Sequence, residues 1–197
     1  MPKPNRRAEI VAATEELART KGLSAVTTRA IAARVGCSEG ALYVHFPGRT
    51  QLLLAVLEES LPDMLGPLRE LEAALGKATP RRNLVKALTA IFHFQERVLP
   101  ILAALFAEPD LLAAYRRTLL ENRKGPRGGI ARLERYLEAE QREGRVDLAI
   151  DPGIAAETLM AGCFFHAFTS LFFGPGEPFD KFSKKLVGSV LREPKAI

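Results

Sequence analysis

The chain has 197 residues, of which 47% are hydrophobic and 26% are charged. This mixture is typical of a globular protein, excludes an intrinsically disordered chain, and leaves room for one large domain or two small ones. The formal net charge is +5, and residues 1–50 hold 8 Lys/Arg against 4 Asp/Glu, whereas the rest of the chain holds 20 against 19. An N-terminal excess of positive charge suits a polyanion such as nucleic acid, although a merely solvated basic face would give the same count.

Cysteine usage and hydropathy bear on the compartment. Cys37 and Cys163 are the two cysteines, too few for a disulfide framework. The N-terminus "MPKPNRRAEI" lacks the apolar run of a signal peptide. The most apolar stretch, residues 159–173, is shorter than the roughly 20 residues that span a bilayer. We therefore expect a soluble cytoplasmic protein with no membrane partner.

Helical patterns begin near the N-terminus. "RRAEIVAATEELARTKGL" predicts an amphipathic helix that ends at Gly22, and "TTRAIAARV" predicts a second helix capped by Thr27 or Thr28. A third helix opens at Ser38. The fourth starts near Arg49 and runs through "QLLLAVLEESL"; we expect the prolines and glycine at 62–67 to kink or break it.

The remaining two thirds of the chain are also predicted to be helical. Further helices are expected at 81–98, 101–107, 111–123, 130–143, 152–174 and 179–191. Pro100 should separate the first two, Asp110 should cap the third, and "KGPRGG" (124–129) should form a loop. Asp151 and Pro152 form an N-cap and N1 pair. Without an alternating strand pattern, the sequence predicts an all-α protein of about nine helices.

The segment "TTRAIAARVGCSEGALYVHF" has the features of a helix-turn-helix. Ala32 provides a small residue where two helices cross, and Gly36 tolerates the positive φ of a tight turn. Apolar residues face inward on both helices, and Ser38 caps the second. The apolar residues are Ile31, Val35, Cys37, Leu42 and Phe46. An Ala-x-x-x-Gly pattern alone often marks only a helical hairpin, but the basic surroundings and the capped aromatic helix favour DNA binding.

The longer segment "TTRAIAARVGCSEGALYVHFPGRTQLLLAVLE" resembles the N-terminal region of the TetR (tetracycline-repressor) family of bacterial transcription regulators. The resemblance covers residues 4–64, with the helix-turn-helix at about 27–46, and includes the paired threonines, the Gly turn and the Leu-Tyr-x-His-Phe run. Residues 65–197 resemble the family in helix order and length, which implies a C-terminal ligand-binding and dimerisation domain.

The resemblance implies a set of DNA contacts. Thr28 and Arg29 would lie at a helix N-terminus that meets phosphate, and Tyr43 and His45 would bond backbone phosphates. Arg49, where the family more often has lysine, would bind a further phosphate at the start of the fourth helix. The expected DNA-binding residues are Thr28, Arg29, Glu39, Gly40, Ala41, Tyr43, Val44, His45 and Arg49.

Several of these residues have an alternative interpretation. Tyr43 and His45 could be ordinary half-buried packing residues. Glu39 stands where the family often has Lys, Gln or Pro; it could accept a hydrogen bond from a cytosine amino group or simply favour the helix dipole. Val44 could contact a thymine methyl group. Cys37 could be a redox switch, but a small buried thiol is the favoured interpretation.

The second domain carries more aromatic residues at helical spacing than one stripe can bury. They could form plain core, or line an apolar ligand pocket in which a histidine is a polar handle. We expect no metal at His93 or His166, and no cofactor. The candidate ligand-binding residues are Phe92, His93, Phe106, Tyr115, Phe165 and His166.

The helix at 151–174 is apolar nearly all round in its second half, which suits burial between subunits. With 179–191 it would form the four-helix dimer interface typical of the family. The candidate interface residues are Phe164, Phe168 and Phe172. Gly162 stands among bulky rings and would permit close helix approach.

Together these features predict a ligand-responsive DNA-binding repressor. It would act as a homodimer on double-stranded operator DNA and would be released by a small apolar effector of unknown identity. A helical interaction module or a small enzyme without sequence-specific DNA binding is the alternative. The enzyme is disfavoured because the sequence has no phosphate-cradling Gly loop, Ser-His-Asp pattern, HExxH or Cys-x-x-Cys.

Overall fold

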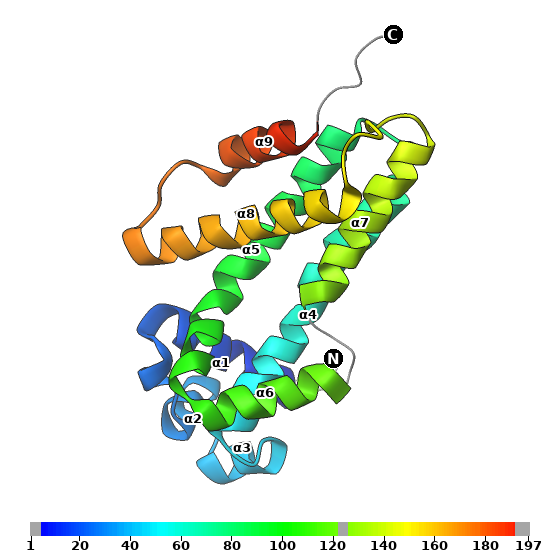
Figure 1. The fold of residues 1–197 in the computed structure, drawn as a ribbon. Helices are drawn as coiled ribbons and strands as arrows, with labels where there is room; N and C mark the ends of the chain where they lie inside the picture. The colour runs from blue at the N-terminus through cyan, green and yellow to red at the C-terminus, as the bar shows by residue number, and fades with distance from the viewer. Residues whose placement is uncertain (1–4, 122–125, 192–197) are drawn as a thin grey trace. The chain divides into compact units, whose positions relative to one another are not determined.

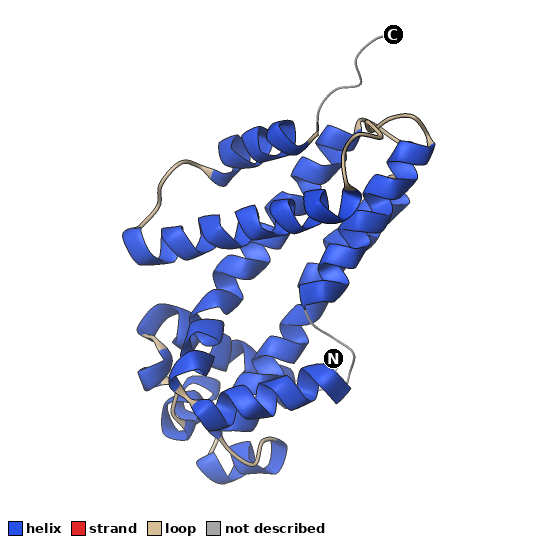
Figure 2. Ribbon diagram, in the orientation of Figure 1, coloured by secondary structure: helices blue, strands red, loops and turns tan. Residues whose placement is uncertain are grey.

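The structure, a computed structural model, describes residues 5–121 and 126–191. Over these residues the chain forms nine α-helices, labelled in Figure 1, and one 3₁₀ turn. Figure 2 shows helix and loop throughout the described part, as the all-α prediction requires. In chain order the elements are α1 (Arg6–Lys21), η1 (Leu23–Ala25), α2 (Thr28–Val35), α3 (Glu39–His45), α4 (Arg49–Ala73), α5 (Pro80–Ala107), α6 (Pro109–Glu121), α7 (Pro126–Arg142), α8 (Pro152–Phe173) and α9 (Phe179–Val190).

The chain divides into two compact units, and α4 and α5 each contribute to both. The first unit is formed by the described residues within Met1–Leu61 and Arg97–Glu121, and the second by those within Pro62–Glu96 and Asn122–Ile197. The first cut falls in α4, after Leu61. The first unit also takes in the end of α5 and all of α6. The 4–64 and 65–197 domain bounds stay a prediction.

The first unit has an apolar core built from amphipathic helices. α1 buries Ile10 and Leu17, α2 buries Ile31, and the first half of α4 buries Leu52 and Leu53. Each of these aliphatic side chains is removed from water, which stabilises the unit by roughly 1.5–3 kcal/mol per side chain before entropic costs. The core therefore fixes the short helices α2 and α3 against α1 and α4.

The second unit buries apolar residues from α4, α5, α7, α8 and α9, among them Leu68, Leu88, Leu137, Leu159 and Val187. The close approach of α8 and α9 has a local cause. A Cβ built on Gly162 would lie 2.6 Å from Cδ2 of Leu186, so a larger residue at position 162 would force the Leu186 side chain to move. The close contact that Gly162 permits is therefore with α9 of the same chain.

A polar network ties the turn between α4 and α5 to the end of α7. Glu140 is fully buried, and its Oε2 lies 3.1 Å from Nε of Arg145. Nη2 of Arg145 donates to the carbonyl oxygens of Lys77 (3.4 Å) and Ala78. Ala78 has a φ of +47°, a left-handed conformation rarely adopted by alanine, so the arginine holds a strained turn in place. The network joins segments more than 60 residues apart.

Tyr136 of α7 extends this polar network to α5. Asn83 Nδ2 donates to the Tyr136 hydroxyl at 3.0 Å and to the Lys77 carbonyl oxygen at 2.8 Å. Burial raises the pKa of Tyr136 because the phenolate would lose its hydration, so the ring stays neutral and its hydroxyl can accept from Asn83. The hydrogen bond between Asn83 and Tyr136 thus connects α5 to α7.

Proline does not break α4 or α5, which corrects the expected interruption at Pro100 and leaves a kink as the expectation for α4. α4 continues through residues 62, 66 and 67, and Pro100 lies inside α5. An internal proline removes one backbone hydrogen bond, but the buried faces continue on either side: Met64 and Leu68 in α4, Leu99 and Ile101 in α5. Tertiary packing supplies most helical stability in proteins, so the packed faces outweigh the local defect.

Two helix starts also differ from the predictions. α6 begins at Pro109, so Asp110 lies in its first turn instead of capping it. α7 begins at Pro126, so the residues 126–129 of the predicted 124–129 loop are helical, while 124 and 125 lie outside the described residues. Both helices begin with proline, which has no backbone N–H to satisfy and a φ suited to the first helical position.

Two helices have the length and apolar composition of a membrane span. α5 and α8 each contain an 18-residue window of mean hydropathy 1.3, and α8 has 22 residues, more than the 159–173 stretch judged from the sequence. Core helices of soluble proteins have the same properties, so this finding leaves the absence of a membrane partner a prediction.

Candidate nucleic-acid interface

Local capping builds the helix-turn-helix between residues 27 and 46. Thr27 caps α2, its Oγ1 accepting from the Ala30 amide at 3.1 Å. Gly36 ends α2 with a φ of +70°, the left-handed conformation that glycine adopts without strain. Ser38 then caps α3, its Oγ accepting from the Ala41 amide at 3.1 Å. The helix limits are thus set by neighbouring residues.

Packing then fixes the orientation of α3. Leu42 is fully buried, and Phe46, just beyond the helix, is almost fully buried. The guanidinium of Arg7 lies 5.1 Å from the centroid of the Phe46 ring, which is a cation–π contact. Two apolar anchors and one arginine therefore hold α3 so that its opposite face points to solvent.

The solvent face of α3 carries the residues expected to contact DNA. Tyr43 is 50% exposed and Val44 is 82% exposed. Gly40, Ala41 and His45 are exposed as well. An apolar side chain as exposed as Val44 adds nothing to the core, so its position suits contact with the thymine methyl group that projects into the major groove.

A hydrogen bond links the starts of α2 and α3. Thr28 Oγ1 donates to Oε2 of Glu39 at 2.7 Å. Sequence reasoning selected both residues but not their contact, which joins positions 11 apart in the chain. Beside them Arg29 is exposed. The Thr28 hydroxyl is thus already engaged by protein, and the carboxylate is fixed at the edge of the exposed face.

Arg49, the first residue of α4, has partners inside the protein. Its Nη1 donates to Oε1 and Oε2 of Glu108 at 2.8 and 2.6 Å. Its Nε donates to the carbonyl oxygen of Val26 at 3.1 Å, and its Nη2 to that of Leu23 at 3.4 Å. The guanidinium is only partly exposed. Its expected phosphate contact therefore competes with an ion pair.

Ion pairing within the first unit decides which positive charges remain available. Within residues 5–121, five arginines form salt bridges: Arg6 with Glu9, Arg7 with Glu59, Arg34 with Glu16, Arg49 with Glu108, and Arg97 with Glu15. Arg34 lowers the pKa of Glu16 by hydrogen bonding to the carboxylate. Arg29 has no such partner in the described part of the chain, so its charge is free for phosphate.

The candidate ligand residues fall into two groups. Phe92, His93 and His166 line one groove of about 620 Å³ in the second unit, between α5, α8 and the segment leading into α9. The Phe92 and Phe179 rings stack at 4.0 Å between centroids. Phe165, on the same unit, is exposed. The other two candidates, Phe106 and Tyr115, belong to the first unit, and Phe106 is 80% exposed.

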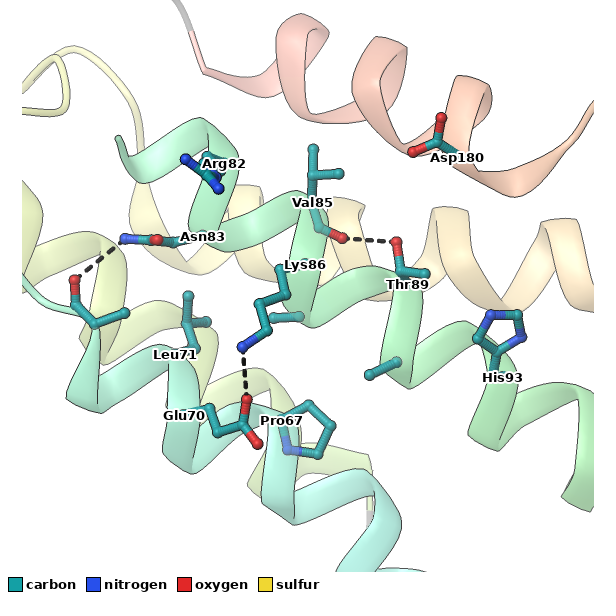
Figure 3. Close-up of a pocket in the computed structure, with 13 residues that line it drawn as sticks. Pro67, Glu70, Leu71, Arg82, Asn83, Val85, Lys86, Thr89, His93 and Asp180 are labelled. Carbon is teal, nitrogen blue, oxygen red and sulfur yellow. Dashed lines mark hydrogen bonds and ion pairs between the residues drawn. The ribbon is translucent and has the colours of Figure 1, made fainter. Parts of the chain in front are cut away.

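Sequence reasoning missed a second hollow of about 540 Å³ in the second unit, shown in Figure 3. It lies between the end of α4 and the beginning of α5, and Asp180 from α9 also lines it. Lys86 Nζ donates to Glu70 Oε2 at 2.9 Å across it, so the two charges neutralise each other. These polar residues lie on exposed helix faces, whose pattern does not distinguish a hollow from plain surface.

The candidate interface residues form an exposed aromatic stripe on α8. Phe164, Phe168 and Phe172 recur every four residues, and their rings contact in sequence, with centroids 6.5 and 4.7 Å apart. Phe172 is 65% exposed. Such a continuous apolar stripe is unusual on the surface of a soluble monomer.

Capped α2 and α3, a left-handed glycine between them and an exposed second helix define a helix-turn-helix DNA-binding protein. The model of bacterial regulatory proteins of the tetR family matches residues 10–56. Nucleoid occlusion factor SlmA of Serratia proteamaculans is 33% identical over 171 residues, which cover 82% of this chain and 80% of that protein. The chain belongs to the tetR family, so it is a DNA-binding transcription regulator and not an enzyme.

Two further relatives set the limits of the comparison. SlmA of Aliivibrio fischeri is 43% identical over 63 residues, so the match spans only 32% of that protein. A TetR transcription regulator from Haloarcula marismortui has the same fold, with a TM-score of 0.73, 16% identity, and coverage of 95% of this chain and 99% of that one. Identity this low supports the fold alone.

Proposed function

We propose that this regulator is a cytoplasmic repressor, which binds a pseudo-palindromic operator as a homodimer and leaves it when a small apolar ligand binds. Residues 4–64 are the DNA-binding domain, and 65–197 are the ligand-binding and dimerisation domain. The observation that carries the DNA part is the exposed face of α3, with Tyr43, Val44 and His45 outward and Leu42 and Phe46 holding the helix from behind.

On this proposal, each residue of the surface has a separate role. Arg29, unpaired within the described residues, neutralises a phosphate, and Tyr43 and His45 hydrogen-bond the backbone. Glu39 and Val44 face the base edges, with Gly40 and Ala41 allowing the helix close to the groove floor. Thr28 acts through Glu39, which its hydroxyl already contacts at 2.7 Å.

The aromatic stripe on α8 supports the homodimer. Pairing two copies through Phe164, Phe168 and Phe172 would remove three exposed rings per subunit from water, and the same patch would serve both subunits about a two-fold axis. Two recognition helices related by that axis would read half-sites one helical turn, about 34–36 Å, apart.

The groove lined by Phe92, His93 and His166 supports the effector. Its volume of about 620 Å³ suits a small molecule, and its stacked rings offer apolar contact with His166 as a polar group. We infer that ligand binding shifts α4, which contributes to both units, and changes the separation of the two recognition helices. A change of a few Å would then prevent simultaneous docking in both half-sites.

The decisive experiment is selection of duplexes from random sequence with the purified protein, followed by sedimentation of the complex. The proposal requires an enriched inverted repeat bound by two chains, with affinity that falls as salt rises. Enrichment of a single half-site bound by one chain would contradict the dimer, and salt-independent binding would contradict the phosphate contacts. Thermal shift with a panel of apolar molecules, compared between wild type and Phe92→Ala, then tests the effector.

The relatives favour a second candidate function. The SlmA proteins are named as nucleoid occlusion factors, and the match to the Serratia protein covers most of both chains. A protein of that kind would act through DNA sites spread over the nucleoid instead of through one promoter. Sequencing the genomic fragments bound by this protein separates the two: few sites next to genes favour the repressor, and many dispersed sites favour the alternative.

A further inference from the structure

Glu108 occupies a single-residue junction between two helices. α5 ends at Ala107 and α6 begins at Pro109. The Leu112 amide donates to the Glu108 carbonyl oxygen at 2.9 Å, so its backbone is held by the first turn of α6. Its carboxylate is therefore presented from a defined position, with both oxygens within 2.8 Å of Nη1 of Arg49.

The carboxylate and a DNA phosphate would bind the same guanidinium group. Arg49 already gives its Nε to Val26 and its Nη2 to Leu23, and Nη1 is the nitrogen turned to the anion. A guanidinium pairs with carboxylate and phosphate through the same planar donors, so it cannot satisfy both fully at once. The two side chains are about one third exposed, so a phosphate can approach the pair.

We propose that Glu108 is an internal competitor for the operator phosphate at Arg49 and thereby sets the DNA affinity of the protein. This inference rests on the proposed DNA contact of Arg49. In the free protein Glu108 neutralises Arg49; DNA binding exchanges the carboxylate for a phosphate. Because Glu108 directly follows α5, which also carries Phe92 and His93, any movement of this helix end that tightens the ion pair weakens DNA binding.

Glu108→Gln tests the competition. It removes the negative charge and nearly preserves the shape, so Arg49 is freed for phosphate. The probe is the duplex that the wild-type protein selects from random sequence. We expect Glu108→Gln to bind it about 1.5- to 5-fold more tightly at low salt, the range for one partly exposed ion pair. The slope of log K against log salt should stay close to that of the wild type, because Arg49 contacts the same phosphate in both complexes.

Two further variants make the result specific. Asp110, two residues from Glu108, lies in the first turn of α6, and Asp110→Asn makes the same change of charge there. This variant should show less than half of the gain in DNA affinity. In an Arg49→Ala background, Glu108→Gln should change neither the DNA affinity nor its salt dependence, because the guanidinium for which Glu108 and the phosphate compete is absent. If glutamine unfolds the protein, Glu108→Asp, which shortens the carboxylate and weakens the pair, should still tighten binding.

The outcomes separate this inference from the proposed function. Unchanged or weaker binding by Glu108→Gln overturns the competition and leaves the ion pair a structural anchor, while operator binding stands. An equal gain in Asp110→Asn overturns it as well, because net charge alone would then explain the result. Failure of the wild-type protein to select any duplex overturns the proposed function itself.

Discussion

The Thr28 hydroxyl donates to the Glu39 carboxylate at 2.7 Å, and this hydrogen bond orients the carboxylate at the start of α3. One carboxylate oxygen is engaged by protein, and the other remains an acceptor on the exposed surface. In the major groove cytosine offers an amino donor, whereas guanine offers only acceptors. If Glu39 faces the base edges as proposed, its carboxylate favours cytosine and disfavours guanine.

We accordingly predict that Glu39→Ala relaxes the preference at one position of each half-site by about 1–3 kcal/mol, without changing the others. The measurement is affinity for a series of operators with single base changes. Thr28→Val, which keeps the shape but loses the hydroxyl, should weaken the same preference less. An equal loss of affinity for every operator in the series would instead show that Glu39 stabilises α3 and does not contact a base.

Tyr43→Phe and His45→Ala should each lower operator affinity while changing the free energy of unfolding by less than about 0.5 kcal/mol, the usual range for exposed positions. Both residues are exposed, so their removal leaves the core intact. Chemical denaturation and DNA titration of the same preparations give both values. A large loss of stability would support the packing interpretation of these side chains.

Phe168→Glu should convert the protein to a monomer. The substitution places a charge in the aromatic stripe of α8, and the two-fold axis would bring two such charges together out of water. Sedimentation velocity measures the result, and operator affinity should fall about 100-fold or more because each half-site then binds alone. Leu148→Glu, at an equally apolar position that is 80% exposed and outside the stripe, is the matched control.

Gly162→Ala should destabilise the second unit by about 1–3 kcal/mol, the cost of inserting a methyl group into a packed contact. Its added Cβ would clash with Leu186 of α9 at 2.6 Å. Gly66→Ala is the control, because that helical position has no neighbour within 4 Å and alanine favours helix there. Equal stability of the two variants in thermal unfolding would contradict the tight α8–α9 packing.

The two thiols should differ in reactivity. Burial raises the pKa of Cys163 to about 12, because the thiolate would lose its hydration. The Cys163 thiol therefore stays protonated at pH 8, and it is also shielded from reagent. A thiol reagent should modify only the partly exposed Cys37 in the native protein and both cysteines after denaturation. Native Cys37→Ser should not react; rapid labelling of that variant would show that α8 opens readily.

The helix-turn-helix could be predicted from the sequence because its signals are local. Thr27, Gly36 and Ser38 act within a few residues of themselves, so the local sequence is enough to predict where the two helices begin and end. The all-α class followed from helical periodicity in the same way. Arg49 was different, because its partner Glu108 lies 59 residues away and no spacing rule connects them.

Other features depended on packing. The expected kink or break in α4 and the interruption of α5 followed from the backbone chemistry of proline, whereas the continuous helices follow from buried residues on either side of it. Gly162 was expected to allow close approach, but only the structure assigns that approach to Leu186. The roles of individual DNA, ligand and interface residues stay predictions until the experiments above are done.

The contacts of Arg145 have a consequence for synthesis of the chain. Its side chain fixes the turn at Lys77 and Ala78, where alanine holds a left-handed backbone. During translation α4 and the start of α5 leave the ribosome before residue 145 has been synthesised. The hydrogen bonds from Arg145 to this turn are therefore absent while the N-terminal half emerges. The DNA-binding helices are complete by then. The protein is therefore expected to fold in a fixed order. The helix-turn-helix can fold first, and the turn at Lys77 and Ala78 is stabilised only after the end of α7 has been synthesised.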